Sequence, residues 1–525
     1  MLGSKVKEHI LNELHEWTYY AIILDCTPDV SHTEQLSLVI RYVRCESGKE
    51  PCIQEHFLGF LPIDCSTGEA LTDTLLSQLE DLKIRLRNMR GQGYDNGANM
   101  KGKHSGVQSR IRSMNPREFF VPCSAHSLNL VVNDAVVSCH EAVNFFSILQ
   151  EVYNYFSAST YRWSVLKKHV TSLTVKPLSE TRWESRIDAV TPFRYQIGEI
   201  YDALFELSSD SRTDAYGKNA ALGLARKLKN FQFICCLVVW HTVLFRINLI
   251  SKLLQKEQIN ISKAVELIAK VKSHFEEMRT EKGFEMTLVD AREIAETLDI
   301  EPVFPIESQV RPRKIKRQFD YESQDESTVD PKKAFTGNFY FYVLDHAINS
   351  LEERFSQLTT HNDIFGFMYN VKNEDKDTLL KKCADLQSAL TDENHCDVEG
   401  LQLHQELLVL LSLLPDECAT GPWDILAYIT TNGLSENFPN VYIALRIALT
   451  LPVSVASGER SFSKMKLIKN YLRYAMSQER LVGLAMMSIE HEILQEIDIE
   501  SIMKDFAEKK PAKWYFSLFV IIVNV

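Results

Sequence analysis

The sequence predicts a mixed α/β domain combined with a large all-α part. Three strand-type apolar runs lie within the first 61 residues, strand and helix patterns alternate from there to about residue 136, and helical periodicity dominates from about 140 to 430. With 45% apolar and 24% charged residues, the 525-residue chain has a globular composition and enough length for more than one structural unit.

The first elements are an amphipathic helix and three strands. The strand-type runs are YAIILD (Tyr20 to Asp25), LSLVIRYV (Leu36 to Val43) and IQEHFLGFL (Ile53 to Leu61), which together predict an antiparallel meander. TDTLLSQLEDLKIRLRNM (Thr72 to Met89) then predicts an amphipathic helix with Thr72 as its cap.

The following segments continue the order as strand, helix, strand, helix. They are GQGYDNGANMKGKHSG, the helical VQSRIRSM, the buried-strand pattern FFVPC (Phe119 to Cys123) and SAHSLNLVVNDAV. This order matches a ribonuclease H-like mixed sheet, in which the first and fourth strands lie side by side. Asp25 and Asp95 are then expected at neighbouring strand ends.

Charge and cysteine usage exclude several classes of protein. The net charge of −12 means that DNA binding has to come from local basic patches. The 11 cysteines contain no CxxC pair, so we expect neither a disulfide framework nor a structural zinc site, and a reducing intracellular compartment fits best.

No secretory signal or membrane span is expected. The N-terminus is charged and lacks a signal-like apolar core. The longest apolar stretches, around Phe231 to Phe245 and Trp514 to Val525, are shorter than the roughly 20 residues that cross a bilayer.

A break in the helical pattern falls near residues 301 to 335. RPRKIKRQ places five basic residues there ahead of the acidic DYESQDESTVD, which predicts an exposed loop. The run from Arg311 to Arg317 is either a nuclear localisation signal or an ordinary basic loop.

Asp25 and Asp95 are candidates for metal-dependent phosphodiester chemistry. That chemistry needs carboxylates that converge on one or two divalent cations. Asp25 ends an apolar strand, and the glycines near Asp95 (Gly91, Gly93 and Gly97) allow tight turns and the close approach of a bulky substrate. The alternative is that both aspartates only form turns.

Five ordered motifs resemble hAT-superfamily transposases, especially the zinc finger MYM-type protein 1-like and TTF-type-domain branch. Four are ILDCTPDVSHTEQLSLVIRYV, GQGYDNGANMKGKHSGVQSRI, PCSAHSLNLVVNDA and PLSETRWESR. The fifth, PNVYIALRIALTLPVSVASGERSFSKMKLIKNYLRYAMSQERLVGLAMMSIEHEI, resembles the C-terminal dimerisation region of that family.

The resemblance implies a catalytic and metal-binding triad of Asp25, Asp95 and Glu459, with Mg²⁺ or Mn²⁺ as cofactor if the protein is active. Relatives commonly have alanine where this chain has Gly458. Without the resemblance, Ser457 and Glu459 also fit an ordinary helix start, with the serine as cap and the glutamate favoured by the helix dipole.

The resemblance also implies DNA contacts at His126, Arg182 and Trp183. His126 belongs to a Cys123-x-x-His126 signature, and the tryptophan of the Thr181-Arg182-Trp183 motif resembles one that stacks on a flipped base. The alternatives are a buried Cys123 with a hydrogen-bonded His126, and a tryptophan that belongs to the core.

We therefore expect a ribonuclease H-like part at 1–140, a helical insertion at 141–430, a dimerisation region at 431–500 that completes the core, and a tail at 501–525. The expected function is a transposase-derived protein that dimerises, domesticated or truncated so that it lacks its DNA-recognition zinc finger. The alternative is an active Mg²⁺-dependent transposase core. Its expected partner is itself, as homodimer or higher oligomer, with DNA as a second partner, and its location is the nucleus, with the cytoplasm as alternative.

Overall fold

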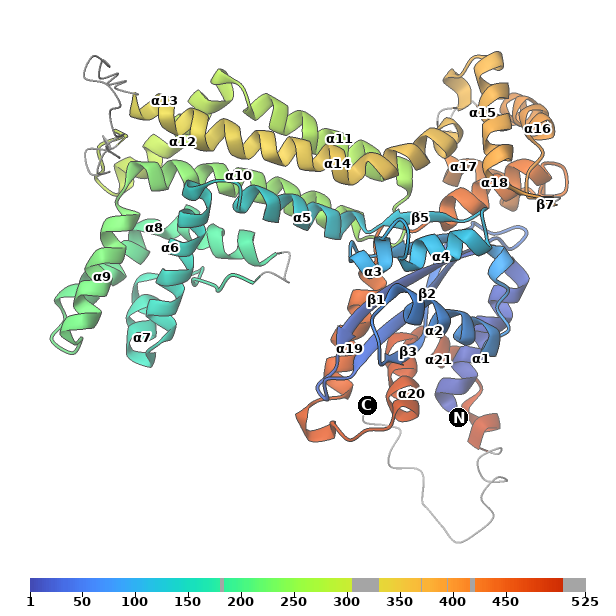
Figure 1. Cartoon of the computed structure of the whole chain (residues 1–525), viewed down its shortest axis with the longest axis horizontal. Helices are drawn as coiled ribbons and strands as arrows, with labels where there is room; N and C mark the ends of the chain where they lie inside the picture. The colour runs from blue at the N-terminus through green and yellow to red at the C-terminus, as the bar shows by residue number, and fades with distance from the viewer. Residues whose placement is uncertain (180–183, 305–329, 370, 394, 416–420, 504–525) are drawn as a thin grey trace, which may run out of the picture. The chain divides into compact units, whose positions relative to one another are not determined.

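A computed structural model describes residues 1–179, 184–304, 330–369, 371–393, 395–415 and 421–503. The chain divides into two compact units (Figure 1): unit 1 is Met1–Cys123 with Asp363–Val525, and unit 2 is Ser124–Asn362. The expected boundaries were 140 and 430. The observed division differs because the helices from residue 376 onward belong to the same compact unit as the N-terminal sheet, on which α18, α19 and α20 pack.

Unit 1 is built on a five-stranded mixed sheet in the order β3-β2-β1-β4-β5. Its strands are β1 (Tyr20–Pro28), β2 (Glu34–Arg44), β3 (Cys52–Ile63), β4 (Met89–Tyr94) and β5 (Phe119–Pro122). The first three pair antiparallel, whereas β4 pairs parallel with β1 and with β5. The predicted meander and the neighbouring first and fourth strands are therefore confirmed.

The helices around this sheet come from both ends of the chain. From the N-terminal part they are α1 (Leu2–Trp17), α2 (Gly68–Asp81), η1 (Leu86–Asn88), α3 (Ala98–Lys101) and α4 (Val107–Met114). From the C-terminal part they are η3 (Gly366–Tyr369), η4 (Val371–Asn373), α15 (Lys376–Ala389), α16 (Gly400–Leu413), α17 (Pro422–Thr431), α18 (Pro439–Thr450), α19 (Ala456–Ile468), η5 (Tyr471–Arg473), α20 (Gln478–Ile489) and α21 (His491–Glu496). A small hairpin, β6 (Thr391–Asp392) and β7 (His395–Cys396), lies between α15 and α16.

The helix predicted at Thr72 to Met89 is wrong at both ends. α2 begins at Gly68, with Thr67 as its cap, because the Thr67 side chain accepts a hydrogen bond from the amide of Ala70. Thr72 is buried inside the helix and donates to the carbonyl of Gly68. The helix ends at Asp81, and Met89 already belongs to β4.

Helices α18, α19 and α20 pack against the meander. The buried Arg41 of β2 donates to the carbonyl oxygen of Leu449 in α18, at 3.2 Å. At the end of α20, the Glu490 carboxylate lies 2.8 Å from Nδ1 of His56 and accepts the backbone amide of Phe57 at 2.6 Å. C-terminal residues thus complete the core of the N-terminal sheet.

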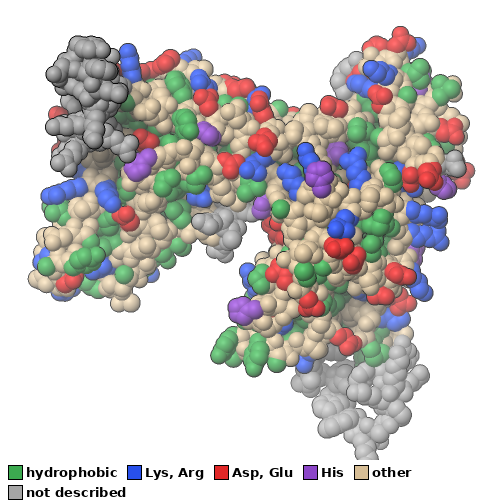
Figure 2. Space-filling view, in the orientation of Figure 1, with side chains coloured by type: hydrophobic (Ala, Val, Ile, Leu, Met, Phe, Trp, Pro, Cys, Tyr) green, Lys and Arg blue, Asp and Glu red, His purple; other side chains and the backbone are tan. Residues whose placement is uncertain are grey.

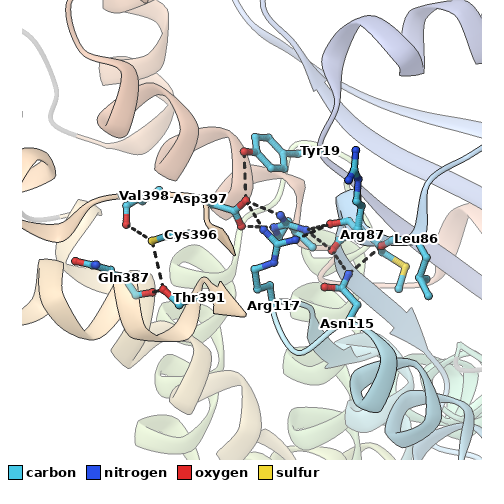
Figure 3. Close-up of polar contacts among 12 residues, drawn as sticks. Tyr19, Leu86, Arg87, Asn115, Arg117, Gln387, Thr391, Cys396, Asp397 and Val398 are labelled. Carbon is cyan, nitrogen blue, oxygen red and sulfur yellow. Dashed lines mark hydrogen bonds and ion pairs between the residues drawn. The ribbon is translucent and has the colours of Figure 1, made fainter. Parts of the chain in front are cut away.

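A buried ion cluster joins the β6–β7 hairpin to the sheet (Figure 3). Asp397 accepts hydrogen bonds from Arg90 at 2.6 and 2.7 Å and from Arg117 at 2.9 Å. All three side chains are less than 10% exposed. The hydroxyl of Tyr19 also donates to Asp397, at 3.5 Å. The cluster fixes a segment almost 300 residues away in the sequence against β4 and β5.

Unit 2 consists of helices. They are α5 (Ser124–Val136), α6 (His140–Ser157), α7 (Thr160–His169), α8 (Ser185–Ser209), α9 (Ala215–Leu228), α10 (Phe231–Leu254), α11 (Ile261–Met278), α12 (Glu281–Thr297), α13 (Pro331–Phe335), the π-helix η2 (Thr336–Phe341) and α14 (Tyr342–Phe365), whose last turn lies in unit 1. The basic run at Arg311 to Arg317 lies outside the described residues.

Helix α10 is longer than the apolar stretch that the sequence suggested. It continues past Phe245 to Leu254, so by length and composition alone its 24 residues could cross a membrane. The expectation that this stretch is too short is therefore wrong. Because 67% of its most apolar window is buried among the helices of unit 2, the same pattern also fits a central core helix.

Candidate functional site

Asp25 and Asp95 lie at two adjacent strands of the sheet, β1 and β4. In the parallel pairing of β1 with β4, Ile23 is opposite Gly93, so both aspartates follow the same rung by two residues. Asp95 is the first residue after β4. Asp25 lies within β1, opposite Ser37 of β2, beyond the last residue that pairs with β4. The expected neighbouring positions are confirmed.

Backbone amides orient both carboxylates. The amide of Cys26 donates to Oδ1 of Asp25 at 3.0 Å, and the amide of Gly97 donates to Oδ1 of Asp95 at 3.0 Å. A Cβ atom at Gly97 would lie 3.1 Å from that same Asp95 oxygen, so a side chain there would crowd the turn. Each of the two aspartates is only half-buried.

Glu459 reaches the same place from the opposite end of the chain. It lies in the first turn of α19, which packs on β1 and β2. The hydroxyl of Ser461 lies 2.8 Å from that of Ser37, the residue opposite Asp25. Gly458 approaches so closely that a Cβ atom there would lie 3.1 Å from the Cβ atom of Asp25.

Burial and neighbouring carboxylates raise the pKa values of Asp25 and Glu459. Burial, followed by the charge of Asp95, raises the pKa of Asp25 to about 7. Burial, followed by the charge of Asp25, raises the pKa of Glu459 to about 8. Burial is the larger cause for both groups, and the neighbouring carboxylate adds to it.

The three carboxylates are of the kind that binds a divalent cation, but their side chains are not placed around one common point. Carboxylate oxygens are the ligands that Mg²⁺ prefers. Within the described part of the chain, however, no three His, Cys, Asp or Glu side chains are placed so that they could hold one metal ion together. Like charges repel, so carboxylates that share no cation are expected to stand apart.

The glycines of β4 leave room for another segment of this chain, and not for a substrate. Gly91 and Gly93 are buried strand residues, and a Cβ atom at Gly93 would lie 2.8 Å from Cγ of Pro452. A Cβ atom at Gly91 would lie 3.0 Å from Leu451. The expectation that these two glycines admit a bulky substrate is wrong, because the α18–α19 connection fills that space.

Cys123 has a structural role. It is buried, its amide donates to the carbonyl oxygen of Tyr94, and its Sγ accepts the amide of Val455 at 3.4 Å. Val455, not Ser457, is the N-cap of α19, so the interpretation of Ser457 as a cap is wrong. The sequence carried no signal for the contacts of Cys123, Ser37 or Pro452 with the α19 region.

Of the remaining predicted site residues, the structure describes only His126. His126 belongs to unit 2, where it is half-buried in the first turn of α5. Arg182 and Trp183 lie outside the described residues. Of the predicted site residues that the structure describes, Asp25, Asp95 and Glu459 belong to unit 1.

Helices from the far end of the chain complete the sheet of unit 1, and each of these two parts matches a family model. Residues 1–106 match the family described as "ZMYM1/FAM200, RNase-like domain", and residues 406–493 match the "hAT family C-terminal dimerisation region". The predicted resemblance to hAT transposase-derived proteins is confirmed, and the second match includes helices α18 to α20.

Similarity to curated proteins extends over most of the chain. Over 94% of its length, the chain is 22% identical to the human protein named "52 kDa repressor of the inhibitor of the protein kinase" and to the mouse protein of the same name. The chain spans 65% of the length of each relative.

Proposed function

We propose that this protein acts as a dimer in the cell nucleus, as a domesticated descendant of a transposase. The observation that carries dimerisation is the surface of the region from residue 406 to 493. Although α18 to α20 cover the sheet, this region leaves large apolar side chains 52% to 88% exposed, namely Val409, Leu413, Leu467, Tyr471, Leu472 and Tyr474. Apolar groups gathered on a surface mark sites of protein association.

The nuclear location rests on the relatives, which are named as repressors. A fluorescently tagged full chain is expected to accumulate in nuclei. Exclusion of the tagged chain from nuclei would contradict this part of the proposal.

Light scattering tests dimerisation directly. For a 60.3 kDa chain, the proposal expects a mass of about twice that value at micromolar concentration. A single species with the mass of one chain over the whole concentration range would overturn it.

A second candidate function is divalent metal-dependent cleavage and transfer of DNA strands. The raised pKa values of Asp25 and Glu459 favour it, because burial and, secondly, a neighbouring carboxylate shift both groups, as is common at functional sites. The strand order of unit 1 fits the finer, ribonuclease H-like assignment. Asp25, Asp95 and Glu459 would hold Mg²⁺ or Mn²⁺, which would activate a water molecule and stabilise the leaving oxygen. His126, Arg182 and Trp183 remain proposed DNA contacts.

Thermal unfolding with Mn²⁺ tests the metal site separately from activity. A cation present at 100 times its dissociation constant stabilises the folded state by about 2.7 kcal/mol, so the melting temperature of the wild type should rise. Asp95→Asn should abolish this rise, whereas Asp73→Asn, at an exposed position of α2, should leave it unchanged. An equal rise in all three proteins would contradict a metal site at the three carboxylates.

A further inference from the structure

Helix α16 has two apolar faces, and the described part of the chain covers only one of them. Leu403, Leu407 and Leu410 point inward and are at most 2% exposed. On the opposite side, Leu401, Val409 and Leu413 are 61%, 54% and 52% exposed. Together with Gln405 they follow one another in steps of four residues, so they form a single row along the helix. We call these four residues the α16 row.

The α16 row carries no charge. Glu406 is the only carboxylate of the helix, which has no lysine or arginine. Its oxygens accept the side-chain amide of Asn440 at 2.6 Å and the backbone amide of Val441 at 2.9 Å, at the start of α18. Glu406 is therefore turned inward, where the N-terminal end of α18 stabilises its charge. Gln405 is the only polar member of the row.

We propose that a second copy of this chain docks along the α16 row, so that the two α16 helices pair across a two-fold axis. This inference rests on the proposed dimerisation, and it names the surface. The match to the dimerisation region begins at residue 406, within this helix. In Figure 1, α16 lies at the edge of unit 1, and it packs on α15 and α18.

A second exposed apolar surface lies in the same region, at the connection between α19 and α20. This surface, the α19–α20 tip, consists of Leu467, Tyr471, Leu472 and Tyr474, which are 61% to 88% exposed. Figure 2 shows hydrophobic side chains gathered at this end of unit 1.

Charge decides between the two surfaces. A two-fold interface places each surface against its own copy. The α19–α20 tip is flanked by exposed Lys464, Lys466 and Arg473, and no acidic residue lies between Lys464 and Ser477. Pairing two tips would bring like charges together, which opposes association. Pairing two α16 rows places uncharged side chains against one another, and the nearest acidic residues outside α16, Glu399 and Asp416, come before and after the row in the sequence.

Two-fold pairing also predicts which residues meet. The row is centred between Gln405 and Val409, so antiparallel helices would place Leu401 of one copy near the end of the row that carries Leu413 in the other. The row of 13 residues is about 18 Å long at the rise of an α-helix. It supplies the apolar centre of an interface, and neighbouring polar residues supply the rim.

The test compares two matched double variants of the full chain by light scattering. Val409→Lys with Leu413→Lys introduces charge in the α16 row, and Leu467→Lys with Leu472→Lys does so in the α19–α20 tip. Because all four positions are exposed, both variants should keep the wild-type circular dichroism and melting temperature. We expect the α16 variant to raise the dimer dissociation constant at least about 100-fold, as loss of a central apolar contact does. The tip variant should remain dimeric.

The outcomes separate this inference from the function on which it rests. If the wild type is monomeric, proposed dimerisation itself fails. If the wild type and the folded α16 variant are equally dimeric, the chain dimerises through another surface and the inference is overturned. Loss of the dimer only in the tip variant would assign the interface to the tip. A fully folded, monomeric α16 variant beside a dimeric tip variant supports the inference.

Discussion

Gly458 lies so close to Asp25 that a Cβ atom on the glycine would be 3.1 Å from the Cβ atom of the aspartate. This contact sets how near α19, and therefore Glu459, comes to β1. Replacing Gly458 with alanine removes the helix penalty of glycine, which is about 1 kcal/mol, but it also pushes α19 and β1 apart by a few tenths of an ångström. We expect the two effects to nearly cancel in the free energy of unfolding.

Gly458→Val is expected to lower that free energy by about 1 to 3 kcal/mol, because the larger side chain overpacks the contact. Gly483→Ala in α20 is the matched control, since a Cβ atom there would meet nothing within 4 Å. Urea denaturation should find this control more stable than the wild type. A Gly458→Val variant as stable as the wild type would show that α19 can move away from Asp25 without cost.

A buried ion pair fixes the other end of α19. Lys469 donates to Oδ2 of Asp29 at 2.6 Å, and the two side chains are 7% and 1% exposed. Asp29→Asn leaves the lysine buried without its partner, which costs about 3 to 5 kcal/mol. Lys469→Met should cost less, because Asp29 keeps the donors Ser31 and Gln35. In urea denaturation, the double variant should cost less than the sum of the single ones.

The Asp29 contribution should depend on pH in one direction. Burial acts to raise its pKa, but hydrogen bonds from Lys469, Ser31 and Thr33 outweigh this and lower the pKa from 3.8 to about 2. The folded protein therefore stabilises the ionised form of Asp29 relative to the unfolded chain. The stability difference between wild type and Asp29→Asn should be constant above pH 3.8 and shrink as pH falls toward 2. A difference that grows on acidification would contradict this assignment.

The ion cluster around Asp397 predicts a large loss of stability. Asp397→Ala removes the carboxylate with which both Arg90 and Arg117 form ion pairs. Leaving buried guanidinium groups unpaired costs about 3 to 5 kcal/mol. Asp385→Ala, at an exposed position of α15, should change stability by less than about 0.5 kcal/mol. Similar losses in both variants would mean that the cluster does not hold the β6–β7 hairpin in place.

Local patterns in the sequence predicted the sheet well. The apolar runs at Tyr20 and Leu36 specify β1 and β2, and the order of elements placed Asp25 beside Asp95. Their signal is local, because alternation and turns arise from neighbouring residues. The β4 strand was harder to recognise, because Gly91 and Gly93 are residues that strands usually avoid.

Contacts between distant parts of the chain could not be predicted from patterns. Nothing local to Pro452 indicates that it fills the space over Gly93, and nothing local to Asp397 indicates two arginines that precede it by 307 and 280 residues. The position of Glu459 came from the family resemblance, not from its spacing. Such contacts depend on tertiary packing, which periodicity does not encode.

The final prediction concerns Asp25, because a buried carboxylate that could bind a cation destabilises the folded state when no cation is bound. Its pKa is raised from 3.8 to about 7 by burial and by Asp95, so the folded protein favours the protonated form. As pH rises from 3.8 through 7, ionisation of Asp25 progressively destabilises the folded state relative to the unfolded one. Asp25→Asn removes this effect, so we expect the variant to be more stable than the wild type at pH 8 and to gain less at pH 5.

Melting temperatures measured without divalent cations at these two pH values check the prediction. Asp73→Asn, an exposed position in α2, controls for the general loss of one negative charge and should change stability by less than about 0.5 kcal/mol at either pH. If Asp25→Asn is instead less stable at pH 8, the hydrogen bond from the Cys26 amide outweighs the cost of burying the charge. The carboxylate would then be a structural turn residue, and the case for a cation site at Asp25 would lose its electrostatic support.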